Sequence, residues 1–557
     1  MDIFTSEIIK DSLVATGEEM FQAMIRTSMS PIIYEATDFA VGATDAEGNL
    51  LAQGNGVAGF LATLDTAVQA LLTHYPLSEI YENDVFMTNS PYEGGGTHLS
   101  DVVLLVPVFY EGQLIAWTVN KAHWTEVGGM HAGSVTTQST EIYQEGLHFR
   151  FLKIYDQGVL NKSLYQLIRD NVRLPESTLG DLHAGVAAAR VGENRIKDLA
   201  GKYGVASLLQ AMEELLDYGE RMTLLELSKL PEGVYEAEDI IESDGHGNGP
   251  FKVKVKITLT HKKVTMDFTG TDPQATGPIN VTSSGLVTAT RCLFKSITNP
   301  DIPANGGSFR PMEVICPEGT VFSAASPAPV SLYYESDVTC MDLIWRALAP
   351  VLKDRLPAGN YASVGATFLS GIHPDTGKLF VMGEPLAGGW GAAQTRDGDS
   401  GQFCALNGET FNIPCELFES RYGVRIDQMA FHNEPGGEGE FIGGKGIKLD
   451  YRVTSDVVYL TFSAGHAETR PWSMDGGNEG SNNYALILRE DGSEERLNIC
   501  TAVPVKKGEV IRIVTGTGGG YGSPGERSAE QVALDIKNGY LTEEQAKKHF
   551  DYQAAAN

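Results

Sequence analysis

The chain has 557 residues, of which 42% are hydrophobic and 20% charged, a composition typical of a globular protein with large cores. Its formal net charge of −30 disfavours nucleic acid as a partner, because neutralising phosphates requires lysine and arginine. No run of about 18 apolar residues is present, so we expect no transmembrane helix and no membrane partner. The acidic N-terminus MDIFTSEIIKDSL lacks the features of a signal peptide, which favours a cytoplasmic location.

The first predicted elements are helices and a hairpin. Residues 5–28 carry apolar side chains at helical spacing and predict one or two helices. Residues 36–53 predict a hairpin with DFAVGA and LLAQ as its strands and DAEGN as its turn. A helix over 56–75, ended by Pro76, comes next. The stretches VFMTN, VVLLVPVFY and LIAWTVNKAH then predict three strands, the last two joined by a turn at Glu111–Gly112.

The rest of the chain changes from helical to strand patterns. Residues 158–231 predict helices, and the stretch LPEG ends them. Residues 251–270 alternate as in a half-exposed antiparallel sheet, and residues 270–345 mix helix with Gly/Pro loops. From 346 to 525 the strands are short and glycine clusters are dense, and the last 30 residues predict two short helices, the second capped by Thr542.

Together these patterns predict an α+β fold with a mixed multi-layer architecture, antiparallel sheets, a helical middle segment and a glycine-rich β C-terminal half. We divide the chain into three expected regions. Residues 1–231 form an N-terminal α/β region with the helical segment, residues 232–345 a β-rich middle region, and residues 346–557 a glycine-rich β region with a helical tail.

Four residues at predicted strand ends have side chains that suit a metal ion. His98 and Asp101 flank the point where the loop GGGTHLS becomes a strand, Asp38 begins an earlier strand, and His123 ends a later one. If these strands are neighbours in one sheet, their ends converge, and imidazole and carboxylate groups suit Zn, Mn or Fe(II). The alternative is that His-x-x-Asp only makes a hydrogen bond near a turn.

Two glycine-rich stretches raise the question of a nucleotide site. GTGGGYGSP (516–524) and GEGEFIGGKG (437–446) resemble loops that cradle phosphates with backbone N–H groups. Neither contains the Gly-Lys-Ser/Thr of a P-loop, so we interpret both as tight turns between short strands. The chain is therefore expected to have no nucleotide site of its own.

Several long motifs resemble the B subunits of the hydantoinase/oxoprolinase family, which includes the lactamase subunit of ATP-dependent caprolactamase and the alpha subunits of acetone carboxylase. The likeness begins with NSPYEGGGTHLSDVVLLVPVF, NKAHWTEVGG and TEIYQEGL. It continues nearly to the end of the chain with DFTGTDPQATGPIN, IPANGGSFRPMEVICPEGTVF, NEPGGEGEFIGGKG and GTGGGYGSPGER. Three positions depart from the common family pattern, namely Trp124, Glu126 and His131, and these leave the substrate open.

The resemblance implies a division of labour between two subunits. A partner A subunit with an actin/Hsp70-like ATPase fold binds ATP and phosphorylates the substrate, and the B subunit carries a divalent metal that completes the reaction. The family's ligands fall on Asp38, His98, Asp101 and His123, with zinc the first expectation and manganese or iron the alternatives. The partners would form a heterotetramer or a larger complex.

The function expected from this resemblance is ATP-dependent opening of a cyclic amide, such as a hydantoin, 5-oxoproline or a lactam, by metal-activated water. Glu126, three residues after His123, is the candidate catalytic base, with the alternatives that it orients a ligand or is a surface charge. Glu141 and Glu145 are further candidates for that role. The alternative functions are the equivalent subunit of a ketone carboxylase and a non-catalytic scaffold for the ATPase subunit.

Overall fold

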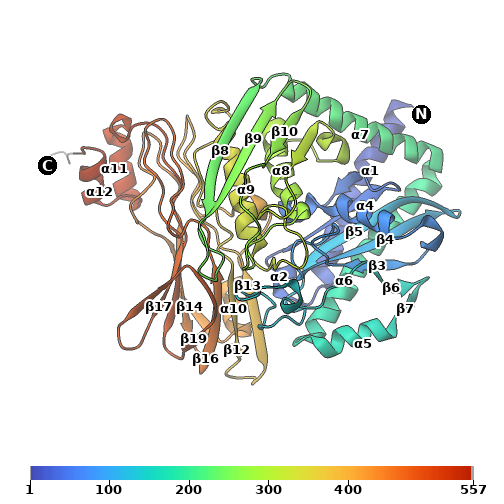
Figure 1. Ribbon diagram of the computed structural model, residues 1–557, viewed down its shortest axis with the longest axis horizontal. Helices are drawn as coiled ribbons and strands as arrows, with labels where there is room; N and C mark the ends of the chain where they lie inside the picture. The colour runs from blue at the N-terminus through green and yellow to red at the C-terminus, as the bar shows by residue number, and fades with distance from the viewer. Residues whose placement is uncertain (1, 553–557) are drawn as a thin grey trace. The chain divides into compact units, whose positions relative to one another are not determined.

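The computed structural model describes residues 2–552 and has a mixed α+β architecture with four mostly antiparallel sheets, as expected (Figure 1). The chain divides into two compact units, each built from separate segments. The first unit is Met1–Val234, Lys256–Asp337 and Leu406–Ile413, and the second unit is Tyr235–Val255, Val338–Ala405 and Pro414–Asn557. The division into three consecutive regions that the sequence suggests remains a prediction.

A seven-stranded antiparallel sheet forms the centre of the first unit, with strand order β2-β1-β5-β4-β3-β6-β7. Its strands are β1 Phe39–Asp45, β2 Leu50–Gln53, β3 Val85–Thr88, β4 Asp101–Tyr110, β5 Gln113–His123, β6 Leu152–Asp156 and β7 Val159–Leu160. The hairpins predicted at β1–β2 and β4–β5 are both present. The second closes through Glu111 and Gly112, which both have positive φ and so give the tight turn that matches strand twist.

Helices cover both faces of this sheet, which explains why its central strands are continuous apolar runs. The alternate residues Val102, Leu104 and Val106 of β4 pack in one cluster with α1 and α6. Val103 and Leu105 pack in another cluster, with α4. The helices of this region are α1 Ile3–Thr27, α2 Pro31–Tyr34, α3 Ala58–Leu61, α4 Leu64–His74, α5 Lys162–Asn171, α6 Pro175–Tyr203 and α7 Val205–Leu227. A strand buried on both faces loses the polar alternation of a half-exposed strand.

Two of the predicted helical stretches are interrupted. The helix expected over 56–75 breaks at Thr63, whose φ of −123° is not helical, and Thr63 Oγ1 donates to the carbonyl of Phe60 at 3.0 Å. The stretch 158–231 contains three helices and is interrupted at Gly204, which has a φ of +81°. Local hydrogen bonding by a threonine hydroxyl and the left-handed glycine account for these breaks.

A second sheet follows in the chain, with order β11-β10-β9-β8 and a parallel pair at β10–β11. Its strands are β8 Gly233–Ile241, β9 Phe251–Leu259, β10 Val264–Asp267 and β11 Met312–Ile315, and helices α8 Ser283–Thr298 and α9 Tyr333–Leu348 lie in the same part of the chain. The alternation predicted over 251–270 is present in β9, where Val253, Val255 and Ile257 are buried.

The second unit contains two more antiparallel sheets. The first has order β13-β12-β16-β19 and the other β14-β15-β20-β17-β18. The elements are β12 Thr367–Ile372, β13 Leu379–Glu384, α10 Cys415–Arg421, β14 Val424–Phe431, β15 Ile447–Val453, β16 Val457–Ser463, β17 Tyr484–Leu488, β18 Glu494–Leu497, β19 Ile499–Lys506 and β20 Val510–Val514. The two predicted C-terminal helices are α11 Ala529–Asn538 and α12 Glu543–His549, and Thr542 caps the latter.

Some glycines of the clusters in the second unit serve close backbone packing in addition to the tight turns expected. A Cβ added to Gly444 would lie 1.9 Å from the carbonyl oxygen of Asp399, and one added to Gly518 would lie 2.1 Å from that of Trp390. Neither glycine has a positive φ. These two positions therefore require glycine because backbone segments pack directly against each other, whereas Gly437 and Gly522 in the same stretches have φ values of +75° and +71°, as in tight turns.

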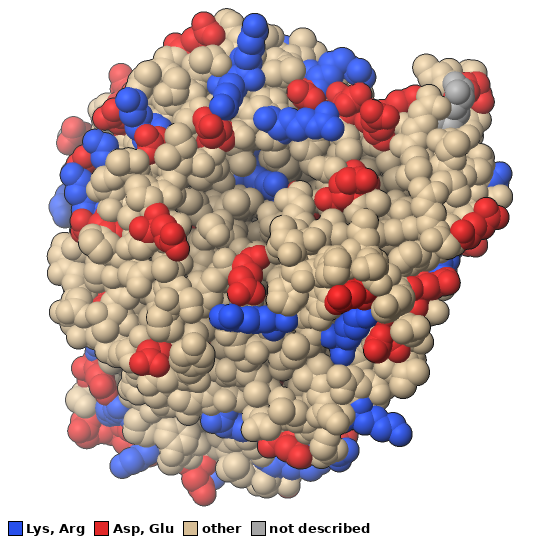
Figure 2. Space-filling view, turned by 45° about the vertical axis from the view of Figure 1, so that its right-hand side comes forward, with Lys and Arg blue, Asp and Glu red and all other residues tan. Residues whose placement is uncertain are grey.

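Among residues 2–552, no helix is long and apolar enough to cross a membrane. On the part of the described surface that Figure 2 shows, acidic and basic side chains are interspersed. That face offers no continuous basic patch of the kind that neutralises nucleic acid phosphates.

Candidate metal centre

The ends of three adjacent strands bring the predicted ligands together. In the order β1-β5-β4, the residue His123 at the end of β5 is the register partner of Asp101, the first residue of β4. On the other side, the backbone N–H of His123 donates to the carbonyl of Asp38 at 3.1 Å, directly before β1. The convergence expected from the sequence therefore follows from the antiparallel register.

A glycine-rich loop places His98 beside these strand ends. Gly94 and Gly95 have φ values of +88° and +108°, which favour glycine. A Cβ on Gly96 would lie 2.2 Å from the carbonyl oxygen of Asn89, so no larger residue fits there. The Asn89 side chain in turn donates to the carbonyl of Leu99 at 2.7 Å and holds the chain just after His98.

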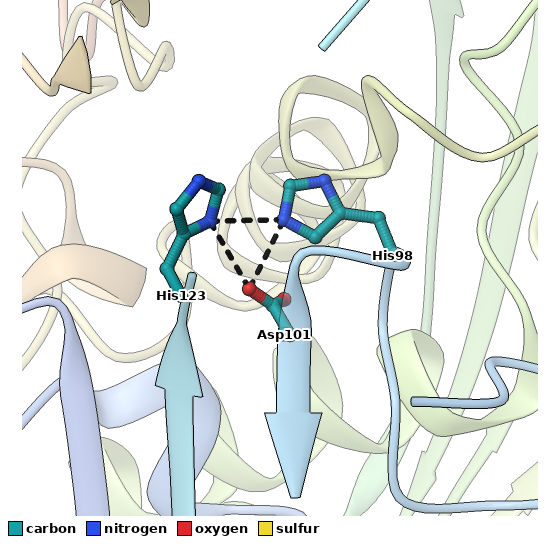
Figure 3. A group of neighbouring side chains, drawn as sticks. All are labelled: His98, Asp101 and His123. Atoms are coloured by element: carbon teal, nitrogen blue, oxygen red, sulfur yellow. Dashed lines mark hydrogen bonds and ion pairs between the residues drawn. The ribbon is translucent and has the colours of Figure 1, made fainter. Parts of the chain in front are cut away.

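His98, Asp101 and His123 form a tight, buried triangle (Figure 3). His98 Nε2 lies 3.0 Å from Asp101 Oδ1 and 3.2 Å from His123 Nδ1. The third edge, from His123 Nδ1 to Asp101 Oδ1, is 3.2 Å. Asp38 is half-buried beside the triangle, with its Oδ2 atom 4.0 Å from His123 Nδ1.

The triangle has the dimensions of a set of metal ligands. Two ligand atoms about 2.1 Å from one ion and about 90–110° apart are separated by about 3.0–3.4 Å. The observed edges of 3.0 and 3.2 Å match this separation. Two imidazoles and a carboxylate are the donor set of many Zn, Mn and Fe(II) sites, so this buried group has the chemistry and spacing to hold such an ion.

Neighbouring groups fix the orientation of two of these side chains. His98 Nδ1 donates to the carbonyl of Ser331 at 3.1 Å, and since a carbonyl can only accept, the proton lies on Nδ1. Nε2, the atom in the triangle, is then the nitrogen of His98 that would bind an ion. The other carboxylate oxygen of Asp101, Oδ2, accepts from the hydroxyls of Thr97 and Tyr333, which directs Oδ1 at the imidazoles.

The charges of the triangle are strongly coupled. Burial alone would raise the pKa of Asp101, but the charge of His98 and hydrogen bonds from both histidines outweigh burial and hold that pKa well below its usual range. Burial raises the pKa of Asp38 to about 6, although the neighbouring charge of His123 opposes the rise. An ionised Asp101 at neutral pH is the form that a metal ligand requires.

Two further buried charged groups lie near the triangle, and the sequence analysis missed both. The Lys121 amine donates to Thr63 Oγ1 at 3.1 Å, and burial lowers its pKa to about 8 against the charges of Asp101, Asp337 and Asp38. Asp337 is fully buried, and burial raises the pKa of its carboxyl well above the usual value, opposed by the charge of Lys121. Lys121 is two residues before His123, a spacing that places both side chains on one face of β5.

Glu126 is also buried, but its carboxylate organises a loop. Its oxygens accept from the backbone N–H groups of Gly128 at 2.7 Å and Gly133 at 2.9 Å, and from Ser134 Oγ at 3.2 Å. Arg173 Nη1 adds an ion pair at 2.9 Å. Among the contacts of the described residues, none joins Glu126 to the triangle, and its role as a catalytic base stays a prediction.

The residues that complete the centre come from far along the chain. Ser331 and Tyr333 lie in the stretch PVSLYYES, more than 200 residues after His98, and carry no metal-ligand spacing of their own. The ring of Tyr333 also packs edge-on against His98 with centroids 5.1 Å apart. Chemistry of this kind, in which a hydroxyl or carbonyl supports a ligand, leaves no recognisable spacing in a sequence.

The chain is similar over nearly its whole length to known proteins. The chain is 31% identical over 569 residues to a protein of Pseudomonas sp. (strain NS671) that is provisionally named as the B subunit of a D-/L-hydantoinase, covering 98% of this chain and 94% of that one. It is 28% identical over 566 residues to the beta subunit of the caprolactamase of Pseudomonas jessenii, covering 99% of this chain and 96% of that one.

Solved structures show the same fold. The crystal structure of ATP-dependent caprolactamase from Pseudomonas jessenii superimposes with a TM-score of 0.92 at 26% sequence identity, covering 100% of this chain and 97% of that chain. The family described as Hydantoinase B/oxoprolinase matches residues 2–524, nearly the whole chain. On this evidence, the chain belongs to the Hydantoinase B/oxoprolinase family.

Proposed function

We propose that this chain is the metal-bearing subunit of a two-subunit, ATP-dependent amidohydrolase that opens a cyclic amide such as a hydantoin, 5-oxoproline or a lactam. The observation that carries the proposal is the buried triangle of His98, Asp101 and His123 in a chain of this family. Two relatives are named as the B and the beta subunits of their enzymes, which implies a partner subunit. The cytoplasm, where ATP is available, is the proposed location.

The proposed ligand set is Asp38, His98, Asp101 and His123. Three of these form the triangle, and Asp38 lies 4.0 Å from His123 Nδ1, within reach after a small side-chain movement. Zinc is the proposed ion, and the same donors also accept manganese or iron. Bound there, a divalent ion supplies a water whose pKa is lowered towards about 7, together with a positive charge beside the reacting carbon.

The protein's own part in the proposed reaction is orientation. Ser331 holds His98 in the tautomer that presents Nε2, and Thr97 and Tyr333 hold Asp101 with Oδ1 facing inwards. An unstrained amide resists water until its oxygen is phosphorylated, which makes the carbon electrophilic. Burial of the triangle keeps bulk water away from such an activated substrate.

ATP is proposed to bind to the partner, an actin/Hsp70-like ATPase subunit, in a heterotetramer or larger assembly. The glycine-rich stretches of this chain lack the Gly-Lys-Ser/Thr of a P-loop. Within these stretches, Gly444 and Gly518 pack directly against neighbouring backbone. Both observations support ATP chemistry on another chain.

The test is co-expression with an ATPase A subunit of this family, followed by assays on hydantoin, 5-oxoproline and caprolactam. We expect ATP-dependent ring opening of at least one of them without bicarbonate, and a complex carrying Asp101→Asn should lack it. A reaction that requires bicarbonate and a ketone would instead identify a carboxylase. Absence of any activity, with no metal in the purified complex, would favour a scaffold.

A further inference from the structure

Glu145 is a buried carboxylate outside the triangle whose contacts all hold backbone or hydroxyl groups. Its Oε1 atom accepts from the backbone N–H groups of Val330 and Ser331, both at 2.9 Å. The same oxygen accepts from Ser139 Oγ at 2.7 Å, and Oε2 lies 3.2 Å from the Val330 nitrogen. The carboxylate therefore anchors the turn that precedes α9.

Ser331 connects this anchor to the triangle. Its N–H donates to Glu145, and its carbonyl accepts from His98 Nδ1 at 3.1 Å. Its hydroxyl also accepts from the backbone N–H of Thr136 at 3.0 Å. The backbone of a single residue thus spans the distance between the Glu145 carboxylate and the imidazole of His98.

This connection controls which nitrogen of His98 is free to bind. The Ser331 carbonyl accepts the Nδ1 proton of His98 and so orients the ring with Nε2 towards Asp101 and His123, where Nε2 would bind an ion. If the carbonyl moved away, neutral His98 could carry its proton on Nε2, and the triangle would lose a ligand atom. Groups that orient a ligating histidine in this way contribute measurably to metal affinity.

We propose that Glu145 is a positioning residue for the metal centre, acting through the backbone of Ser331 on the orientation and tautomer of His98. The inference rests on the proposed role of the triangle as a metal site. It assigns to Glu145 no contact with substrate or metal, in contrast to the acid–base role considered from the sequence. The groups that donate to its carboxylate are the Ser139 hydroxyl and the backbone N–H groups of Val330 and Ser331.

Glu126 provides a matched control. It is also a fully buried carboxylate that accepts from two backbone N–H groups, those of Gly128 and Gly133, and from a serine hydroxyl. None of the groups that it holds hydrogen-bonds to His98 among the described residues. Both substitutions therefore remove a buried carboxyl group that anchors backbone N–H groups, and Glu126→Gln also removes the ion pair with Arg173, but only Glu145 is connected to His98.

The experiment compares Glu145→Gln, Glu145→Ala and Glu126→Gln with the unmodified full-length chain. Zn²⁺ affinity is measured by competition with a chelator. In metal-free protein labelled with ¹⁵N-histidine, the ring nitrogens of His98 are recorded well above the ordinary histidine pKa, and His98→Asn identifies its signals. We expect Glu145→Ala to weaken Zn²⁺ binding about 10- to 100-fold and to shift the Nδ1 signal of His98, because the Ser331 carbonyl that accepts from Nδ1 loses its anchor.

Glu145→Gln keeps an oxygen that can accept from the Val330 and Ser331 N–H groups, so its effect should be smaller than that of alanine. Should the alanine variant fail to fold, the glutamine variant still tests the proposal. Glu126→Gln should leave the His98 signals unchanged. Unmodified Zn²⁺ affinity together with an unmodified Nδ1 signal of His98 in the Glu145 variants would overturn the inference. If the unmodified chain bound no metal, the proposed function would fail, while the His98 spectra would still decide the role of Glu145.

Discussion

Asp101 and His123 are directly opposite each other where β4 and β5 meet, as the last register pair of that antiparallel ladder. Their side chains lie on the same side of the sheet, with Asp101 Oδ1 3.2 Å from His123 Nδ1. The pairing fixes two of the three corners of the triangle through backbone hydrogen bonds. Only His98 depends on a loop, and it is the corner that receives support from Ser331.

The Tyr333 hydroxyl should contribute to metal binding through Asp101. Tyr333→Phe removes one of the two donors to Asp101 Oδ2 and leaves that of Thr97. We expect Zn²⁺ affinity to fall about 10-fold, the lower end of the range for a supporting residue, because Thr97 remains. Chelator competition measures the change. Tyr334→Phe, the same substitution on the next residue, is the control and should change affinity less; equal effects would argue against a specific role of Tyr333.

The isolated chain should not hydrolyse ATP. Its glycine-rich stretches lack a P-loop lysine and hydroxyl residue, and Gly444 and Gly518 pack against backbone. Phosphate release is measured on protein that size-exclusion chromatography has separated from any ATPase partner, with the co-expressed complex as the positive control. Sustained ATP turnover that follows this chain through the column would contradict the proposed division of labour.

Much of the fold and part of the centre follow from sequence patterns. The hairpin strands β4 and β5 are long apolar runs separated by a Glu-Gly turn, so their register places Asp101 beside His123. The breaks at Thr63 and Gly204 are less predictable, because a helical pattern of apolar residues continues across them. Tertiary contacts such as the bond from Lys121 to Thr63 then decide the local structure.

The supporting residues of the centre could not be predicted in the same way. Ser331 acts through its backbone carbonyl, which every residue has, and Tyr333 reaches Asp101 from a helix that begins 232 residues later in the chain. The glycine clusters show a related limit. Glycine is required both in turns and where backbones touch, and only the three-dimensional packing distinguishes the two cases.

Glu126 should stabilise the loop that follows His123. Glu126→Gln weakens the ion pair with Arg173 and the bonds to Gly128 and Gly133. We expect faster hydrogen exchange of the backbone amides in residues 127–134, because these amides lose a charged acceptor. Arg173→Met removes the ion pair and the hydrogen bond from Arg173 to the His131 carbonyl but keeps the Glu126 carboxylate, so it should give a smaller increase. Unchanged exchange combined with loss of activity in the assembled enzyme would instead support the catalytic role.

Asp342 in the second unit should make stability depend on pH. Trp472 Nε1 donates to its Oδ2 at 2.9 Å, and burial raises the pKa of this carboxyl from 3.8 to about 6, opposed by the charge of His466. Because the folded state binds this proton more tightly than the unfolded state, the contribution of Asp342 to stability falls as the pH rises from about 4 to about 6. Asp342→Asn cannot ionise but still offers Trp472 an oxygen.

The free energy of unfolding of Asp342→Asn minus that of wild type should therefore rise across this window, by up to about 3 kcal/mol, and stay level above it. Urea unfolding at a series of pH values measures the difference. Asp354→Asn, at a side chain that is 78% exposed, is the control and should show no such step. Parallel pH profiles for Asp342→Asn and wild type would show that Asp342 does not ionise in this range.

The metal content of the purified chain tests the central proposal most directly. Elemental analysis of the unmodified protein should find about one divalent metal ion per chain, and His98→Ala and His123→Ala should each lose it while circular dichroism shows an unchanged fold. The two substitutions remove separate corners of the triangle, one from the glycine loop and one from β5. Metal retained in full by both variants would contradict the assignment of His98, Asp101 and His123 as its ligands.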